Sequence, residues 1–162
     1  MIRKSQIALV AFTALMMFLT ACRRSDSEDK VIDVAPDNPE MVAAIAKARA
    51  TLPEFWKVFD KPDHGETEFS LKVKISDKGG TEYFWVIDLE RKDGKIFGAI
   101  NNDPDYVKKV KLGDRIEIPQ ADISDWLYMR NGKMVGNETV RPLLKQMSAD
   151  EAARLRSIMA DP

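Results

Sequence analysis

The chain has 162 residues, with 25 basic and 26 acidic side chains, a net charge of −1 and a single cysteine. This mixture lacks the clustered Lys and Arg residues that nucleic-acid binding requires, so we expect no nucleic-acid partner. One thiol can form no disulfide within the chain, and the fold must therefore depend on packing.

The N-terminus has the pattern of a secretory signal. Arg3 and Lys4 precede an uncharged stretch of 13 residues, 7–19, which is too short to span a bilayer comfortably as a helix. The stretch ends in Leu19-Thr20-Ala21-Cys22, which resembles the lipobox of bacterial lipoproteins. That resemblance implies that residues 1–21 are removed and that the Cys22 thiol carries lipid. The alternatives are an ordinary cleaved signal with an incidental cysteine, or an uncleaved anchor.

The lipoprotein resemblance also implies a location. In that family an Asp after the cysteine tends to retain the protein at the inner membrane, whereas Arg23 follows the cysteine here. We therefore expect the lipid on Cys22 to attach the protein to a membrane. The resemblance favours the outer membrane, with the domain facing the periplasm. Several acyl chains on one residue hold a protein on a membrane stably, whereas one chain is marginal.

The remaining chain divides into a tether and one domain. Residues 22–38 are polar and charged, which is typical of a flexible linker with an end-to-end distance of roughly 20–24 Å. Residues 39–162 are long enough for a single domain with its own core. Without residues 1–21, which carry two basic and no acidic side chains, the net charge is −3.

The domain begins with helical patterns. Asn38 is a good N-cap, and Pro39 suits the first helical position. We expect Pro53 to interrupt or kink this helix, and residues 54–60 to continue as a second short helix. The apolar stripe of the first helix consists of Met41, Ile45, Ala48 and Leu52.

Strand patterns occupy the middle of the chain. Apolar and polar residues alternate over 69–76, which predicts a half-buried strand, whereas residues 83–89 are apolar on both faces, which predicts a central strand. Asp93-Gly94 and Asn131-Gly132 each predict a two-residue hairpin turn. Further strands are predicted at 95–100, 115–118, 123–130 and 133–137, and residues 105–111 are either a helical turn or a loop.

The C-terminal part is helical again. We expect Pro142 to open a helix, and Ser148 with Glu151 to form a capping box that starts the last helix. Helices, then antiparallel hairpins, then helices indicate an α+β fold. We expect a curved antiparallel sheet of about five or six strands with N-terminal and C-terminal helices packed on it.

Between Glu54 and Met147 the chain carries short motifs in a specific order and spacing. They are Glu82-x-Phe84-Trp85-Val86, Asp93-Gly94-Lys95-Ile96-x-Gly98, Ile100-Asn101-Asn102 with Pro104, Val110-x-Leu112-Gly113-Asp114, Asp122-Ile123-Ser124-Asp125-Trp126 with Tyr128, and Gly132-Lys133-Met134-x-Gly136-Asn137. This set resembles the YegJ-like bacterial family, a domain of unknown function. The resemblance implies no particular activity, and exported single-domain members of the family agree with an N-terminal signal.

No group of residues has the pattern of a catalytic site. His64 is the only histidine and lies in a polar loop, where a general base would need a partner and a pocket. Asn101, Asp103 and Asp105 have the spacing that opens a calcium loop, but the later positions lack the required Gly and Glu. We therefore expect no enzyme activity, no metal and no cofactor.

Aromatic and polar residues near the second hairpin are the candidates for binding. Trp126 and Tyr128 are either core residues or an exposed aromatic face, and Asp122 and Asp125 are either paired carboxylates or caps at a strand entry. The candidate binding surface consists of Trp126, Tyr128, Arg130, Asp122, Asp125, Asn101 and Asn102.

Three functions are compatible with these patterns. The leading hypothesis is a lipid-anchored, non-enzymatic binding module for a periplasmic protein partner. The second is a small-ligand or glycan-binding module that uses the face of Trp126 and Tyr128. The third, with the least support, is a carboxylate-based hydrolase that uses Asp88, Asp122 and Asp125.

Overall fold

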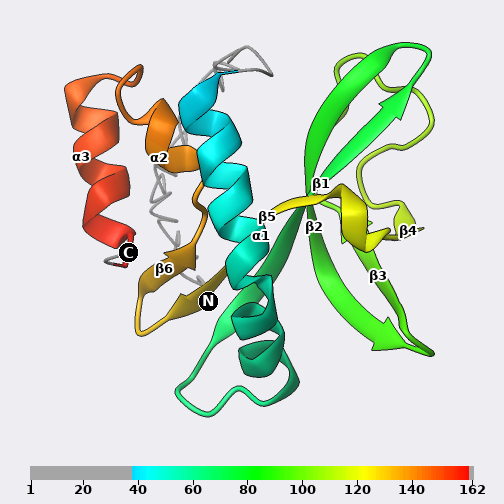
Figure 1. Cartoon of the computed structure of the whole chain (residues 1–162), viewed down its shortest axis with the longest axis horizontal. Helices are drawn as coiled ribbons and strands as arrows, with labels where there is room; N and C mark the ends of the chain where they lie inside the picture. The colour runs from blue at the N-terminus through cyan, green and yellow to red at the C-terminus, as the bar shows by residue number, and fades with distance from the viewer. Residues whose placement is uncertain (1–37, 161–162) are drawn as a thin grey trace, which may run out of the picture. The chain divides into compact units, whose positions relative to one another are not determined.

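The computed structural model describes residues 38–160, which form a six-stranded antiparallel sheet with helices at both ends of the described chain (Figure 1). This confirms the α+β fold. The signal, Cys22 and nearly all of the tether lie outside the described residues. The elements are α1 (Pro39–Asp60), β1 (Thr67–Asp77), β2 (Gly80–Lys92), β3 (Lys95–Ile100), β4 (Arg115–Glu117), the 3₁₀ helix η1 (Gln120–Asp122), β5 (Ile123–Arg130), β6 (Lys133–Gly136), α2 (Val140–Leu143) and α3 (Ala149–Ile158).

The first helix starts as predicted but does not stop where predicted. The Asn38 side chain accepts hydrogen bonds from the backbone N–H groups of Glu40 and Met41, at 2.9 and 3.2 Å. The helix then continues through Pro53 to Asp60, so the expected interruption and the separate second helix are not formed. Proline removes one N–H donor, and the burial of Phe55 offsets that loss by packing the last turns onto the sheet.

The strand order is β4-β3-β2-β1-β5-β6, so the sheet is open and β2 lies inside it, as predicted. Leu71 pairs with Val86 and Val73 pairs with Phe84, and all four side chains are buried on one face. The opposite face of β2 is less covered, because Tyr83 is 40% exposed. Antiparallel sheets commonly close one face and leave the other open to solvent in this way.

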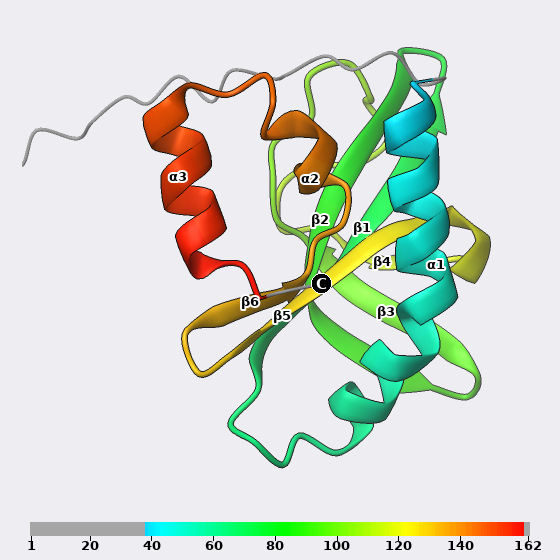
Figure 2. The same ribbon diagram turned by 60° about the vertical axis from the view of Figure 1, so that its left-hand side comes forward.

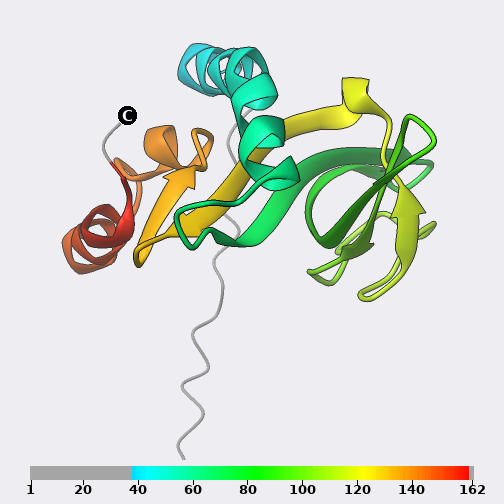
Figure 3. The same ribbon diagram turned by 90° about the horizontal axis from the view of Figure 1, so that it is seen from below.

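Helix α1 crosses the closed face of the sheet and packs on β5 (Figures 2 and 3). The indole N–H of Trp126 donates to the carbonyl of Ala48 at 2.9 Å. The Arg49 guanidinium donates to the carbonyls of Ala121 and Ile123, at 2.9 and 2.8 Å. These bonds fix α1 against η1 and the start of β5, and so fix the distance between the helix and the neighbouring strands. None of the helices in the described range is long and apolar enough to cross a membrane.

Residues 105–111 form a loop rather than a helical turn, and a carboxylate organises it. Glu82 accepts hydrogen bonds from the backbone N–H groups of Asp105, Tyr106 and Val107, at 2.9, 2.6 and 2.5 Å. Burial alone would raise the pKa of Glu82, but these three donors outweigh it and hold the pKa below its ordinary value. The loop thereby buries Val107 against the core.

The C-terminal helices follow the sequence patterns only in part. Ser148 and Glu151 form the predicted capping box at the start of α3. Pro142 does not open α2, which begins at Val140, because a proline is tolerated anywhere in the first helical turn. After α3 the chain returns to the sheet, where Met159 forms a parallel bridge with Met134 of β6.

Candidate binding pocket

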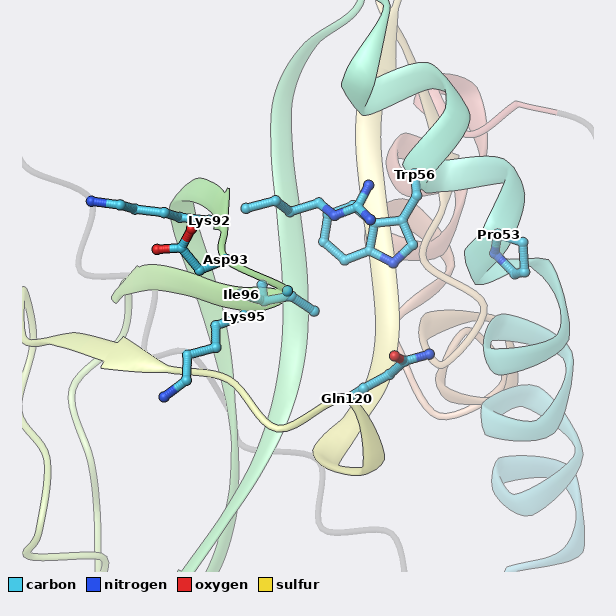
Figure 4. A pocket seen from close by; sticks show the side chains of 9 residues that line it. Pro53, Trp56, Lys92, Asp93, Lys95, Ile96 and Gln120 are labelled. Atoms are coloured by element: carbon cyan, nitrogen blue, oxygen red, sulfur yellow. The ribbon is translucent and has the colours of Figure 1, made fainter.

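A pocket of about 570 Å³ lies between the second half of α1, the β2–β3 hairpin and η1 (Figure 4). It is open to solvent and of a size that accepts a few side chains of a partner. Its lining residues are Pro53, Trp56, Arg91, Lys92, Asp93, Gly94, Lys95, Ile96 and Gln120.

The hairpin turn determines which side chains face the pocket. Asp93 and Gly94 both have positive φ, 51° and 75°, which is the backbone of the type I′ turn that their sequence predicts. Arg91 is therefore directly opposite Ile96 in the ladder, and opposite residues project from the same face. The next pair, Lys92 and Lys95, projects from the other face, and Figure 4 shows both lysines directed away from Trp56.

Arg91 is held at the mouth of the pocket by two contacts. Its guanidinium carbon lies 4.9 Å from the centroid of the Trp56 ring, and its Nη1 lies 2.7 Å from a carboxylate oxygen of Asp60. The Arg91 side chain is 45% exposed and that of Asp60 is 56% exposed. An arginine stacked on an indole and paired on one nitrogen has lost much of its freedom before any partner arrives.

Trp56 is itself fixed by the aromatic cluster beneath α1. Its ring lies edge-on to Phe55 and to Phe59, with centroid separations of 4.9 and 5.5 Å. Arg91 covers a face of the same ring. The floor of the pocket is therefore apolar, and its lining also includes Pro53 and Ile96.

The comparisons with known proteins place the chain in a family. The family model "Uncharacterized protein conserved in bacteria (DUF2314)" matches residues 38–159. The chain belongs to this family. It is 36% identical to "Uncharacterized protein YegJ" of Escherichia coli (strain K12) over 142 residues, which cover 88% of this chain and 92% of that protein.

A second relative of the DUF2314 chain is longer. The "Putative ankyrin repeat protein NMB1133/NMB1171" of Neisseria meningitidis serogroup B (strain ATCC BAA-335 / MC58) is 33% identical over 113 residues. The match covers 65% of this chain and 45% of that protein. No solved structure matches the chain.

Of the residues predicted to form a binding surface, Trp126 and Tyr128 lie in the core. They are 6% and 4% exposed, and their rings stack at 5.9 Å beneath α1. Both project from the face of β5 that α1 covers, so they do not offer an exposed aromatic face. Arg130 is half-buried, lies 5.2 Å from the Tyr128 ring and donates to the buried carboxylate of Glu66 at 2.7 Å.

Asp125 is buried as an anchor for the backbone. It is 1% exposed, and its carboxylate accepts from the N–H groups of Trp126, Glu138 and Thr139, at 2.8, 3.2 and 2.7 Å. Burial raises the pKa of Asp125, although these hydrogen bonds and the nearby Lys72 act in the opposite direction. The carboxylate holds the segment before α2 in place and is not open to a substrate.

Lys72 completes this buried network. Its ammonium donates to the Thr139 hydroxyl at 3.1 Å and lies 5.5 Å from the centroid of the Trp85 ring. Burial lowers the pKa of Lys72, and the charge of Asp125 opposes that shift. Thr139 also forms a side-chain hydrogen bond with Asp125, so its hydroxyl connects the cation to the carboxylate.

The other predicted residues are dispersed. Asn102 accepts a hydrogen bond from the backbone N–H of Trp85 at 2.9 Å, where it replaces a ladder partner, and Asn101 is exposed beside it. Asp122 is half-buried at the end of η1. The seven residues therefore do not gather on one exposed face.

His64 lies in the one group of described residues whose ligand atoms are close enough to hold a metal. A nitrogen of its ring contacts the Asp63 carboxylate, and Glu66 lies nearby, with one ligand atom of each residue within 4.8 Å of the others. Glu66 is already bonded to Arg130, whose positive charge opposes a cation. The group is better described as a hydrogen-bonded loop.

Sequence reasoning missed Trp56 and Arg91 as a pair. Trp56 stands beside the apolar stripe of its helix, and Arg91 stands two residues before the Asp93-Gly94 turn. The register that this turn imposes does place Arg91 and Ile96 on one face. The missing information was which helix lies across that face.

Proposed function

We propose that this DUF2314 chain is a lipid-anchored, non-enzymatic binding module of the bacterial cell envelope, whose pocket binds a segment of a periplasmic protein partner. The observation that carries the proposal is the pre-positioned Arg91 over Trp56 at the mouth of an open pocket. Tryptophan and arginine are the residues most enriched at the energetic centres of protein interfaces. A pair whose side chains are already in contact before a partner arrives binds with less loss of side-chain entropy.

The same pair favours a peptide over a sugar. A glycan ring would stack on an exposed face of an indole, but Arg91 already covers one face of the Trp56 ring. A peptide instead can place an apolar side chain against Pro53 and Ile96 while its polar groups meet the guanidinium. The geometry thus supports the protein-partner hypothesis above the glycan hypothesis.

The membrane part of the proposal rests on Cys22 and the residues around it. The folded domain starts at the N-cap Asn38, so residues 23–38 connect the lipid to the first helix. If the predicted tether is flexible, its reach of roughly 20–24 Å would let the domain stand clear of the lipid headgroups and sample partners beside the membrane.

Site-specific crosslinking tests the pocket in living cells. A photo-crosslinking amino acid in place of Gln120, which lines the pocket and is exposed, should form a product with one particular protein. The same amino acid in place of Arg154, exposed on α3, is the control and should not form that product. Trp56→Ala should abolish the Gln120 product. Identical products from both positions, or none from Gln120, would refute the proposal.

The anchor is tested separately by Cys22→Ser. Without the thiol no lipid can be attached, so the protein should move from the membrane fraction to the soluble fraction of the cell envelope. Intact mass of the wild-type protein should show a start at Cys22 with added acyl mass. Unchanged membrane association of the variant would remove the lipid anchor from the proposal and leave the pocket untouched.

A further inference from the structure

We infer that the pocket recognises an extended peptide segment that carries a carboxylate next to an apolar side chain. Arg91 binds the carboxylate, and the negative charge of the nearby Asp60 weakens that binding. This inference rests on the proposed function and names the chemistry of the segment bound. The inference follows from which N–H donors of Arg91 already have a hydrogen-bond partner in the protein and which do not.

A guanidinium has five N–H donors arranged in a planar fork. In Arg91, Nη1 donates to Asp60, and the guanidinium carbon lies over the Trp56 ring. Within residues 38–160, no partner is found for Nε or Nη2 of Arg91. That pair of nitrogens is the edge that takes a carboxylate through two parallel hydrogen bonds. The receptor edge is therefore held in position and unused.

The cations around the pocket point to one carboxylate rather than to a phosphate-rich surface. Lys92 and Lys95 project from the far face of the hairpin, and Lys95 pairs with Glu117 at 2.7 Å. Among the lining residues, Arg91 is the cation that lies over the Trp56 ring, whereas Figure 4 shows Lys92 and Lys95 directed away from Trp56. A polyanion or an anionic membrane would need several convergent cations, whereas one fork suits one carboxylate.

The remaining lining fits the flanking parts of an extended segment. Pro53 and Ile96 provide apolar surface for a neighbouring side chain. The exposed amide of Gln120 has no partner in the described range and offers both a donor and an acceptor to a peptide backbone. A segment that alternates apolar and acidic residues satisfies both requirements.

Asp60 occupies the neighbouring nitrogen and places a like charge beside an incoming carboxylate. Asp60→Asn keeps an oxygen that can accept from Nη1 but removes the negative charge. We therefore expect Asp60→Asn to strengthen binding of an acidic peptide by about three- to tenfold. Arg91→Lys keeps the charge but loses the fork and the stacking, and we expect it to weaken binding by about ten- to a hundredfold.

The probes are three fluorescein-labelled peptides of equal length in which leucine alternates with aspartate, asparagine or lysine. Binding to the full chain in a non-ionic detergent is followed by fluorescence anisotropy. The matched control is Lys74→Gln, which removes an exposed cation of β1 that does not line the pocket, and should change affinity less than about twofold. Thermal melting of each variant confirms that it is folded.

The expected result is binding of the aspartate peptide alone, lost in Arg91→Lys and stronger in Asp60→Asn. Equal binding of the aspartate and asparagine peptides, no binding of the aspartate peptide, or equal losses in Arg91→Lys and Lys74→Gln would overturn the inference. The proposed function fails separately, in the crosslinking experiment at Gln120. If the Gln120 product persists in Arg91→Lys, the partner still binds and only its recognition through a carboxylate is wrong.

Discussion

Two parts of this domain combine a cation, an indole ring and an aspartate, and they use the combination differently. In one, Lys72 lies over Trp85 and shares a hydrogen-bonded network with the buried Asp125. In the other, Arg91 lies over Trp56 beside the aspartate that ends α1, and the pair is about half exposed. The chemical groups are alike, but their exposure to water is not.

This difference separates a group that stabilises the fold from a group that is available to a partner. Burial requires that polar atoms find partners within the protein, and the Asp125 carboxylate accepts three backbone N–H groups. Exposure allows Arg91 to leave donors to water, and such donors can be transferred to a ligand at little cost. The comparison therefore predicts large stability effects in the interior and binding effects at the surface.

The largest effect should come from Asp125→Ala. The change leaves the N–H groups of Glu138 and Thr139 without their acceptor and Lys72 without its counter-charge, all in a buried place. We expect a loss of about 3–5 kcal/mol in the free energy of unfolding, measured by urea denaturation with two-state analysis.

Lys72→Met sharpens this prediction. If Asp125 stabilises the fold mainly through its hydrogen bonds to the backbone, replacing Lys72 by an apolar residue of similar length should lower the free energy of unfolding by only about 1–2 kcal/mol. A loss equal to that of Asp125→Ala would show instead that the interaction of Lys72 with Asp125 stabilises this part of the fold. Hydrogen bonds to the backbone would then not be what separates Asp125 from the exposed Arg91 site.

The strands and hairpin turns were the parts of the domain most open to prediction. The alternation of Leu71, Val73 and Ile75 with polar residues reflects a strand with one closed face, and β1 has that burial. The two hairpin turns have sequences that tolerate positive φ, and the ladders on both sides follow from them. Local rules suffice here because neighbouring residues carry the information.

The pocket and the faces of the strands depend on contacts between distant residues. The alternation of Trp126 and Tyr128 shows that they share a face, but not that α1 covers it. Trp56 and Arg91 meet only because α1 continues past Pro53, where local rules predict a break. Packing of Phe55 into the core outweighs the tendency of Pro53 to end the helix. That packing involves residues distant in the sequence, so no local pattern predicts it.

A further prediction concerns stability in acid, and it compares two buried carboxylates whose pKa values move in opposite directions. Burial alone would raise the pKa of Glu66, but the N–H of His64 and the Arg130 guanidinium help to lower it from 4.5 to about 2. A depressed pKa means that stability from Glu66 is fully present above pH 4.5 and is lost as the pH falls towards 2. The raised pKa of Asp125 has the opposite sign, because the folded state then favours the protonated form.

Urea midpoints measured between pH 5.5 and pH 2 test these signs. In the wild-type protein the midpoint should fall with acid, and Glu66→Gln should make the profile flatter below pH 4.5. Asp125→Asn should make the fall of the midpoint with acid steeper. The wild-type Asp125 opposes that fall, because its raised pKa favours the folded state as the pH decreases. An unchanged profile in Glu66→Gln would show that other carboxylates, such as Asp77 and Glu82 with their lowered pKa values, account for the acid sensitivity.

The smallest stability effect should come from Arg91→Ala. The change removes a half-exposed ion pair with Asp60 and one stacking contact with Trp56, and exposed interactions of these kinds each contribute about 0.5–1 kcal/mol or less. We expect the free energy of unfolding to fall by about 1 kcal/mol at most, while the affinity for the aspartate peptide is lost. A cost comparable to that of Asp125→Ala would place Arg91 among the residues that hold the fold together. The free donors at Nε and Nη2 would then no longer argue for a ligand, since an arginine that the fold requires needs no partner to explain it.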